Sequence, residues 1–333
     1  MSQPEQAPKR MLKVYRDGDQ TVVEINSSSL DIIQTCPKKA EYSLKRGLTL
    51  KGGKPATTFG SGIHKALEVM YSTPREQREL PKGYKDKIIM MCQGQELPEE
   101  SDYFVYRATR GFLDETTSLA GLDIGDKRSL VNGGWSLGEY FERRIHDPYE
   151  VLVRDGVPLV ETTYELTIYE TKLLKIILFG TVDAIMENKA TGQLVVCDHK
   201  TTSATNMNDF YNRTKPNHQY TAYIHLAQQC LGLDTENFMV NCFQVKPRPK
   251  TSRGAGPNFL HIITKRTPED IEDMIKSVVY YVNQYLSWLD TGYFPFGTVN
   301  ACANYGKCDF LDVCSSPGPI KESIIDANYQ ERT

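Results

Sequence analysis

The segment that most constrains this chain is residues 179–202, which read FGTVDAIMENKATGQLVVCDHKTT. Two β-rich runs, 179–186 and 193–198, flank the turn-like residues 188–192, and this pattern is typical of an antiparallel hairpin. If the hairpin is centred on Ala190 and Thr191, its register is fixed. The predicted hairpin is apolar along most of its length and carries its charged side chains at the open end.

In this register Asp183 and Asp198 lie opposite each other, with Cβ atoms about 5 Å apart. Lys200 points to the same face as Asp198, and His199 points away, because side chains alternate along a strand. Two neighbouring carboxylates repel each other unless a cation lies between them. Oxygen ligands favour a hard ion, Mg²⁺ or Mn²⁺. The alternative is a surface hairpin with a solvated Asp and Lys.

Length and charge set broad limits. The 333 residues allow one large domain or two ordinary ones, and a net charge of −3 argues against a uniformly basic protein but leaves room for a local basic groove. No apolar run approaches the about 20 residues of a membrane span. Residues 1–10 are polar, so we expect a disordered N-terminus rather than a signal peptide, and a cytoplasmic protein.

The cysteines are unlike a disulfide framework, which is typical of secreted proteins. Cys302, Cys308 and Cys314 have the spacing C-x5-C-x5-C, and three cysteines in thirteen residues favour metal or cluster binding. A fourth ligand must then come from elsewhere in the chain. Residues 315–333 are polar and are expected to form a loose tail.

Other segments carry weaker signals. Residues 57–70 predict a glycine-containing turn that enters a helix with His64, although a lone histidine on a helix is more often structural. Residues 73–150 are mostly helical in pattern. The strand-like residues 160–168 offer two candidate acids, Glu161 and Glu165, and the helix that opens at His218 places Gln219 and Tyr223 on one face.

A basic loop rich in proline and glycine follows the apolar strand 238–245. Its cations, suited to phosphate contacts, are Lys246, Arg248, Lys250 and Arg253. The alternative is a mobile connection between two strands.

Four motifs in order resemble those of the RecB-like branch of the PD-(D/E)XK nucleases, especially the iron–sulfur exonucleases of CRISPR systems and phages. They are Gly60-x-x-x-His64, Gly180-x-x-Asp183, Asp198-x-Lys200 and Gln219-x-x-x-Tyr223. The resemblance runs from about residue 27 to residue 314. It implies an α/β fold with a restriction-endonuclease-like core, in which helices flank a mixed central sheet. Residues 11–314 would form one nuclease domain with a helical insertion at about 73–150.

The resemblance also supplies the missing cysteine. Cys36 matches the isolated first ligand of the family's cluster, so with Cys302, Cys308 and Cys314 it would hold a [4Fe–4S] cluster that joins the N- and C-terminal segments. The family's usual spacing of the last three cysteines is x2 then x5. Here it is x5 then x5, which leaves the cluster type, and iron against zinc, as open alternatives.

By the same resemblance, Asp183, Asp198, His64 and the backbone carbonyl of His199 would hold one Mg²⁺ or Mn²⁺. Glu161 fits the upstream acid better than Glu165. The remaining catalytic roles go to Lys200, which would orient or help deprotonate the attacking water, and to Gln219 and Tyr223, which would position the strand and the lysine.

The function implied is a metal-dependent DNA exonuclease on single-stranded ends, in recombination, repair or CRISPR adaptation, with recombination, helicase or adaptation proteins as possible partners. A second reading is a catalytically idle DNA-binding or scaffolding module, which the intact Asp183, Asp198 and Lys200 disfavour. A third is an iron–sulfur redox or sensing protein. No Walker-type motif is present, so we expect no ATPase activity in this chain.

Overall fold

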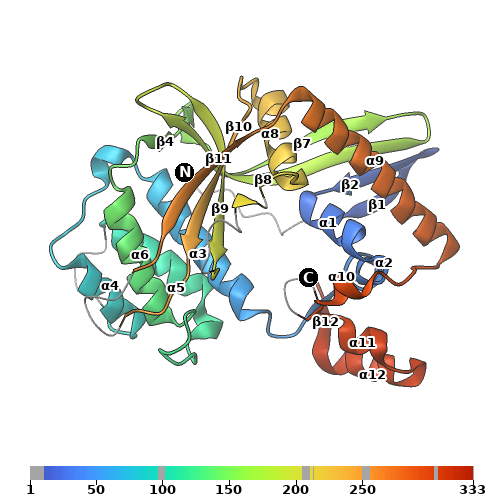
Figure 1. Cartoon of the computed structure of the whole chain (residues 1–333), viewed down its shortest axis with the longest axis horizontal. Helices are drawn as coiled ribbons and strands as arrows, with labels where there is room; N and C mark the ends of the chain where they lie inside the picture. The colour runs from blue at the N-terminus through green and yellow to red at the C-terminus, as the bar shows by residue number, and fades with distance from the viewer. Residues whose placement is uncertain are drawn as a thin grey trace.

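The computed structural model describes residues 11–96, 102–204, 211–212, 214–249, 256–303 and 307–332. A central sheet with helices on both faces organises these residues (Figure 1). This is the mixed α/β architecture expected from the sequence. The N-terminal residues 1–10, expected to be disordered, lie outside the described part. Within the described ranges, none of the helices combines the length and apolar character that a membrane crossing requires.

In the described residues the main sheet has eight strands, ordered β1-β2-β8-β9-β10-β11, with β4 and β7 also paired to β8. Its strands are β1 (Lys13–Asp17), β2 (Gln20–Ile25), β4 (Tyr149–Val151), β7 (Val160–Glu170), β8 (Leu174–Asn188), β9 (Leu194–Thr202), β10 (Asn237–Gln244) and β11 (Phe259–Lys265). The pairs β2–β8 and β9–β10 are parallel and the other pairs are antiparallel, so the sheet is mixed.

Strand β8 changes partner along its length. Its first half pairs with β2, from Leu174 to Leu178, and its second half pairs with β9, from Ala184 to Glu187. On its other edge, β8 pairs with β7 from Lys175 to Ala184 and with β4 from Met186 to Asn188. Residues 179–183 therefore lie between two partners, and β8 and β9 form a fork at this point.

The β8–β9 hairpin has the register expected from the sequence. Ala184 pairs with Cys197 and Glu187 with Leu194, which centres the turn between residues 190 and 191. The paired ladder ends at Ala184–Cys197, one step before Asp183 and Asp198. Beyond that step, β9 continues to Thr202 with β10 as its partner.

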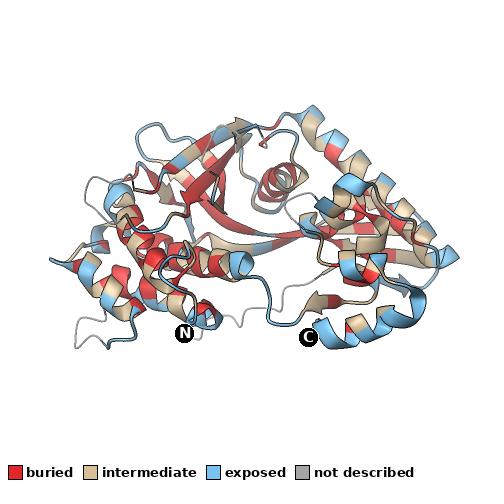
Figure 2. Cartoon of the chain, turned by 60° about the horizontal axis from the view of Figure 1, so that its bottom comes forward, coloured by how far each residue is buried: buried red, intermediate tan, exposed pale blue. Residues whose placement is uncertain are grey.

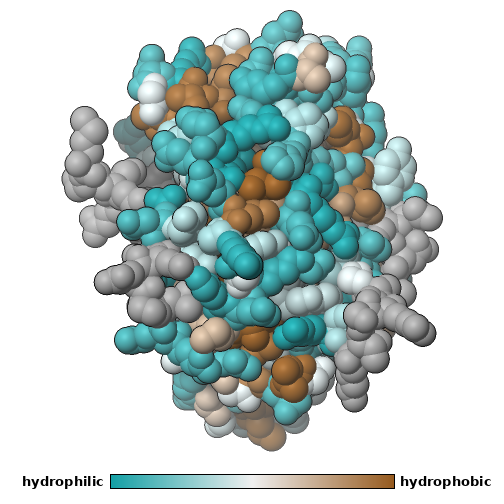
Figure 3. Space-filling model, turned by 90° about the vertical axis from the view of Figure 1, so that its left-hand side faces the viewer, coloured by the Kyte–Doolittle hydropathy of each residue, from teal (hydrophilic) through white to brown (hydrophobic). Residues whose placement is uncertain are grey.

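Helices cover the two faces of the sheet and make two cores. On one face lie α3 (Pro55–Ser72), α4 (Tyr84–Cys92), α5 (Phe104–Glu115) and α6 (Leu130–Arg144), and on the other α1 (Ser27–Thr35), α8 (His218–Leu231) and α9 (Pro268–Thr291). Figure 2 shows buried residues along the middle of the sheet and on the helix faces turned toward it. The outer side of the α4–α6 layer is mostly hydrophilic, with scattered hydrophobic patches (Figure 3). Helices α4, α5 and α6 lie within the 73–150 stretch that has a helical pattern.

Local signals in the sequence explain where the helices begin. Helix α9 opens with a capping box, in which Thr267 and Asp270 each bond the other's backbone N–H, and with Pro268 in the first turn. Helix α8 opens with the side chain of Asn217 accepting from the N–H of Tyr220. These caps satisfy backbone donors that a helix leaves unpaired at its start.

The remaining elements are short. They are α2 (Pro37–Ala40), the π-helical turn η1 (Glu41–Lys45), β3 (Leu48–Leu50), the 3₁₀ turns η2 (Arg75–Gln77) and η3 (Thr117–Leu119), β5 (Val153–Arg154), β6 (Val157–Pro158), α10 (Val299–Ala303), α11 (Leu311–Ser315), α12 (Gly318–Asn328) and β12 (Tyr329–Glu331).

The expectation of a loose tail at 315–333 is wrong for the described residues. α12 and β12 occupy this segment, and β12 pairs with β3. The reason is a small third core, in which the ring of Phe310 stacks between Tyr42 and Tyr329 with centroids 5.3 Å apart on each side. Arg46 also forms a two-pronged ion pair with Glu322. The tail looked unstructured because only a few residues of a polar segment are buried.

Helix α8 lies so close to β8 that a side chain is excluded at Gly180. A Cβ atom at this position would lie 2.8 Å from a ring carbon of Tyr223 and 3.2 Å from a methyl of Leu226. The glycine of the Gly180-x-x-Asp183 motif is therefore required by packing. It lets the helix that carries Gln219 approach the strand that carries Asp183.

We expect Gly180→Ala to lower the free energy of unfolding by about 1–3 kcal/mol, the usual cost of overpacking a core. Gly121→Ala is the matched control, because nothing lies within 4 Å of a Cβ built there and its backbone is not in the left-handed region. Urea unfolding of both variants checks this. Equal stability of the two would show that the α8–β8 contact can relax.

Candidate functional site

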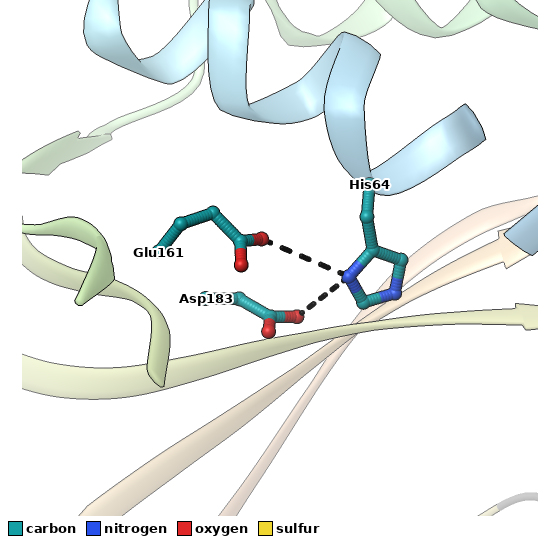
Figure 4. A group of neighbouring side chains, drawn as sticks. All are labelled: His64, Glu161 and Asp183. Atoms are coloured by element: carbon teal, nitrogen blue, oxygen red, sulfur yellow. Dashed lines mark ion pairs between the residues drawn. The ribbon is translucent and has the colours of Figure 1, made fainter. Parts of the chain in front are cut away.

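The candidate site lies at the fork between β8 and β9. β8 contributes Asp183 and β9 contributes Asp198 and Lys200, on the two prongs. The neighbouring strand β7 contributes Glu161, and helix α3 crosses above and contributes His64 (Figure 4). Five side chains far apart in the sequence thus meet where the sheet opens.

His64, Glu161 and Asp183 form a compact group. Nδ1 of His64 is 3.3 Å from Oδ2 of Asp183 and 3.9 Å from Oε1 of Glu161. One donor atom from each residue lies within 4.8 Å of the other two, and within the described residues this is the group that meets that condition. Figure 4 shows the imidazole and both carboxylates turned toward one point. Such a set of one nitrogen and several oxygens could hold a divalent cation.

Glu161 reaches this group through an unusual backbone conformation. It has φ +48°, in the left-handed region that residues other than glycine rarely adopt and that costs roughly 1–3 kcal/mol. Its neighbours Val160 and Thr162 pair with Ala184 and Val182, which places Glu161 opposite Asp183. The side chains of β8 also change orientation here. Val182 packs in the core on the α8 side of the sheet, whereas Ala184, two residues later, packs in the core on the α3 side. Strain at this position is the kind found at functional sites.

The structure brings Glu161, not Glu165, to the site. Glu165 lies farther along β7, pairs with Phe179 and is exposed. The choice of Glu161 over Glu165 as the upstream acid therefore agrees with where the two residues lie. That Glu161 is catalytic stays a prediction.

Asp198 lies in a second cluster beside the first. Its carboxylate is 2.7 Å from Nζ of Lys200, and Nε2 of Gln219 donates to it at 3.4 Å. The same amide group donates to the hydroxyl of Tyr223 at 3.0 Å, so the two residues share a face of α8. In this arrangement Asp198 faces a lysine, outside the compact group of three. Its role as a metal ligand stays a prediction.

The backbone and the ring of His199 contact different parts of the structure. Its N–H donates to Oδ2 of Asp183 at 2.6 Å, which bridges the fork where the ladder has ended. Its imidazole is buried on the side of helix α3, where it stacks on Tyr71. The ring therefore points away from Lys200, as strand alternation predicts. The assignment of its carbonyl as a metal ligand stays a prediction.

The electrostatics of the fork favour a cation. Burial raises the pKa of Asp183, and burial raises the pKa of Asp198 to about 6 despite the attraction of Lys200. Burial alone would lower the pKa of His64, but the neighbouring carboxylates, Asp183 foremost, outweigh it and raise that pKa to about 9. The raised pKa values show that burial costs the ionised carboxylates more than Lys200 and His64 return, and a divalent ion would stabilise the ionised forms further.

The four motif cysteines come from both ends of the described chain. Cys36 lies between α1 and α2, Cys302 in α10, Cys308 before α11 and Cys314 in it. Burial raises the pKa of Cys314 to about 11, and the charges of the other three thiols add to this effect. In the described residues no three of their sulfurs fall within 4.8 Å of one another. The four thiols therefore share one part of the structure, and that they bind an iron–sulfur cluster stays a prediction.

The basic loop is only partly described. The backbone N–H of Arg248 donates to Oδ1 of Asn132, and Nζ of Lys246 donates to the carbonyl of Gly256 at 3.4 Å. Lys250 and Arg253 lie outside the described residues. A role in nucleic-acid binding stays a prediction for all four cations.

The sequence analysis missed a group of buried polar side chains behind the site, Tyr71, Tyr140 and Asn241. Each lies outside the four motifs. The one signal was Asn241 itself, a polar residue in the apolar strand FMVNCF. A buried amide in a strand interior needs partners, but its partners come from distant helices.

Comparisons with known proteins bear on this geometry. The family model described as the PD-(D/E)XK nuclease superfamily matches residues 24–315. No curated protein matches. Among solved structures, a "putative exonuclease" from Eubacterium rectale has 13% identity, covers 75% of this chain and 80% of its own, and gives a TM-score of 0.37. At that TM-score the likeness carries no argument about this chain.

We expect Glu161→Gln to weaken Mn²⁺ binding by at least about tenfold, since even partners outside the ligand set typically cost 10–100-fold. Glu165→Gln is the matched control and should bind Mn²⁺ as the wild type does, because Glu165 lies away from the group. Isothermal titration of the DNA-free protein with MnCl₂ measures both. A loss in the Glu165 variant alone would contradict the assignment.

Proposed function

The chain belongs to the PD-(D/E)XK nuclease superfamily, and from its site we propose that it is a metal-dependent deoxyribonuclease that degrades single-stranded DNA from an end. One observation carries this proposal. A compact group of one imidazole and two carboxylates lies beside the partly buried Asp198–Lys200 ion pair. Metal-assisted hydrolysis of a phosphodiester needs both a cation site and a group that acts on the nucleophile.

The donor set fits the ion that the family implies. His64, Glu161 and Asp183 would hold Mg²⁺ or Mn²⁺, and the imidazole makes Mn²⁺ a suitable choice. We extend the ligand set to Asp198 and the carbonyl of His199, which flank the same fork. When bound, such an ion polarises the scissile phosphate and lowers the pKa of a coordinated water.

The other residues act on the nucleophile and the strand. Lys200, held 2.7 Å from Asp198, can orient a water and offset charge that develops on the phosphate. Gln219 donates to both Asp198 and Tyr223, which fixes the carboxylate and keeps its lone pairs directed into the fork. The N–H of His199 does the same for Asp183.

A cavity beside Gln219 supports a single-stranded substrate. It has a volume of about 600 Å³ and lies between α1 and the start of α8. Its lining is Ser27, Ser28, Asp31, Ile32, Gln34, Pro216, Asn217, His218 and Gln219. Because Gln219 belongs to both the cavity and the catalytic cluster, a nucleotide next to the scissile phosphate can occupy this space. The volume is in the range of small-molecule pockets rather than of a duplex groove.

We also propose that Cys36, Cys302, Cys308 and Cys314 hold a [4Fe–4S] cluster. The support is that thiols from both ends of the described chain lie near enough for Cys36, Cys302 and Cys308 to act electrostatically on Cys314. Four cysteine thiolates are the usual ligand set of such a cluster. Four thiolates can also hold a structural Zn²⁺, which is the alternative.

The biological setting belongs to the same proposal. A nuclease of single-stranded ends would act in recombination, repair or CRISPR adaptation, with a helicase or adaptation protein as partner. The cytoplasmic location expected from the sequence stays a prediction. A DNA-binding scaffold without activity is the alternative, and the site geometry gives no observation in its favour.

The test is cleavage of end-labelled single- and double-stranded DNA by anaerobically purified protein with Mn²⁺, Mg²⁺ or EDTA. We expect Lys200→Ala to lower the rate by about 10²–10⁴-fold, the usual contribution of a group that acts on the attacking water and its proton. Asp198→Asn should also lower the rate, because it removes the negative charge that the cation and Lys200 would share. Lys189→Ala is the control, because Lys189 lies in the hairpin turn and pairs with Glu187.

Metal-dependent loss of label from single strands, and none in EDTA, would support the proposal and reveal the polarity. A folded protein that binds DNA and cleaves none of it with either ion would favour the scaffold instead. Cleavage at the wild-type rate in both variants would show that the catalytic residues lie outside the fork.

The cluster has its own prediction. We expect Cys308→Ala to abolish the visible absorbance of the anaerobically purified protein and to lower its stability more than its residual rate, since metal binding is coupled to folding. Cys230→Ala, at an exposed position outside the motif, should keep the absorbance. A colourless wild type that contains zinc would refute the cluster.

A further inference from the structure

A closed circuit of buried polar side chains lies directly behind the fork. The ring of His199 is 2% exposed and stacks on Tyr71, with centroids 5.5 Å apart and planes at 11°. Nδ1 of the same ring is 3.0 Å from Nδ2 of Asn241. His199 is therefore held in two directions, by a face contact and by a directed hydrogen bond.

Asn241 extends the circuit to the helices. It is fully buried on β10, directly across the ladder from His199. Its Nδ2 also donates to the hydroxyl of Tyr140 on α6 at 2.5 Å, and that hydroxyl is 2.8 Å from the hydroxyl of Tyr71 on α3. The circuit thus joins two strands and two helices and returns to the ring of His199.

The contact between the ring of His199 and the amide of Asn241 is a buried, directed hydrogen bond. With Nδ2 of Asn241 as the donor, Nδ1 of His199 accepts and the ring proton lies on Nε2. Nε2 is buried and makes no hydrogen bond within the described residues. Four polar groups are thus kept in the core, where each unpaired one costs about 1–3 kcal/mol. A buried hydrogen-bond network of this kind rigidifies the elements that it joins.

His199 connects this circuit to two members of the donor group. Its backbone N–H donates to Oδ2 of Asp183 at 2.6 Å. Its ring also packs against the ring of His64, with centroids 5.9 Å apart and planes at 80°. At this point of β9 the ladder to β8 has ended, and the strand that still pairs with β9 is β10. A shift of His199 would displace both Asp183 and His64.

We propose that Asn241, Tyr140 and Tyr71 are positioning residues for the metal-donor group and act through His199. They hold its ring, and the ring in turn sets the orientation of His64 and the backbone N–H that fixes Asp183. The inference rests on the proposed function in one respect, that the donor group binds a divalent cation. Supporting partners of this kind typically change metal affinity by 10–100-fold.

The experiment measures Mn²⁺ affinity of the DNA-free protein by isothermal titration, beside urea unfolding of each variant. Tyr140→Phe removes one hydroxyl and keeps the ring, and Asn241→Leu breaks the circuit at its centre. The matched control is Tyr84→Phe, a buried tyrosine of the same helical layer whose hydroxyl donates to the carbonyl of Gly138. It removes the same atom away from the fork.

We expect the Asn241 variant to lose about 10–100-fold in Mn²⁺ affinity and the Tyr140 variant to lose less, in the same direction. The control should lose stability but keep its affinity. His199→Phe, which keeps the stacking but not Nδ1, should lose as much as Asn241→Leu, and the two losses should not add because they break one circuit.

Folded Asn241 and Tyr140 variants with wild-type Mn²⁺ affinity would overturn the inference, as would a loss in Tyr84→Phe equal to that in Tyr140→Phe. A failure of the nuclease proposal gives a different result from a failure of this inference. If the wild type binds Mn²⁺ and the variants bind it more weakly, but no DNA is cleaved, the positioning role stands and the nuclease does not. A wild type that binds no Mn²⁺ overturns both.

Discussion

The fork between β8 and β9 is the feature on which the rest of the structure depends. β8 pairs with β2 in its first half and with β9 in its second, and its ladder to β9 ends at Ala184–Cys197. Asp183 and Asp198 come next on the two prongs, so the backbone that would have been paired is open. The N–H of His199 turns to the carboxylate of Asp183 instead. A polar site can therefore exist inside an otherwise apolar sheet because the sheet stops pairing there.

Charge explains how such a site is tolerated. Asp183 and Asp198 are buried, and burial raises the pKa of both. Lys200 on one prong and His64 on the crossing helix supply positive charge from the chain itself. The strained backbone of Glu161 brings a further carboxylate toward this point rather than away from it. Backbone strain at Glu161 and the burial of two carboxylates both lower the stability of the fold, and a bound cation would offset the concentrated negative charge.

The packing around the fork serves the same arrangement at longer range. Gly180 lets α8 approach β8, which brings Gln219 to Asp198. The circuit through Asn241 holds the back of the fork against α3 and α6. Farther away, the stack of Tyr42, Phe310 and Tyr329 draws the C-terminal segment onto the N-terminal one and brings the motif cysteines into one neighbourhood. Each of these contacts joins segments that are distant in sequence.

The sequence by itself determined what depends on neighbours along the chain. A short turn and alternating side chains set the hairpin register, and helical spacing put Gln219 and Tyr223 on one face. The order of the four motifs indicated the superfamily and the mixed α/β fold. Only the tertiary structure revealed that Glu161, not Glu165, lies beside Asp183, because that depends on how β7 pairs with β8 and on one left-handed residue. It also revealed the partners of Asn241 and the ordered α12 and β12, since those contacts join residues whose separation in the chain leaves no local pattern.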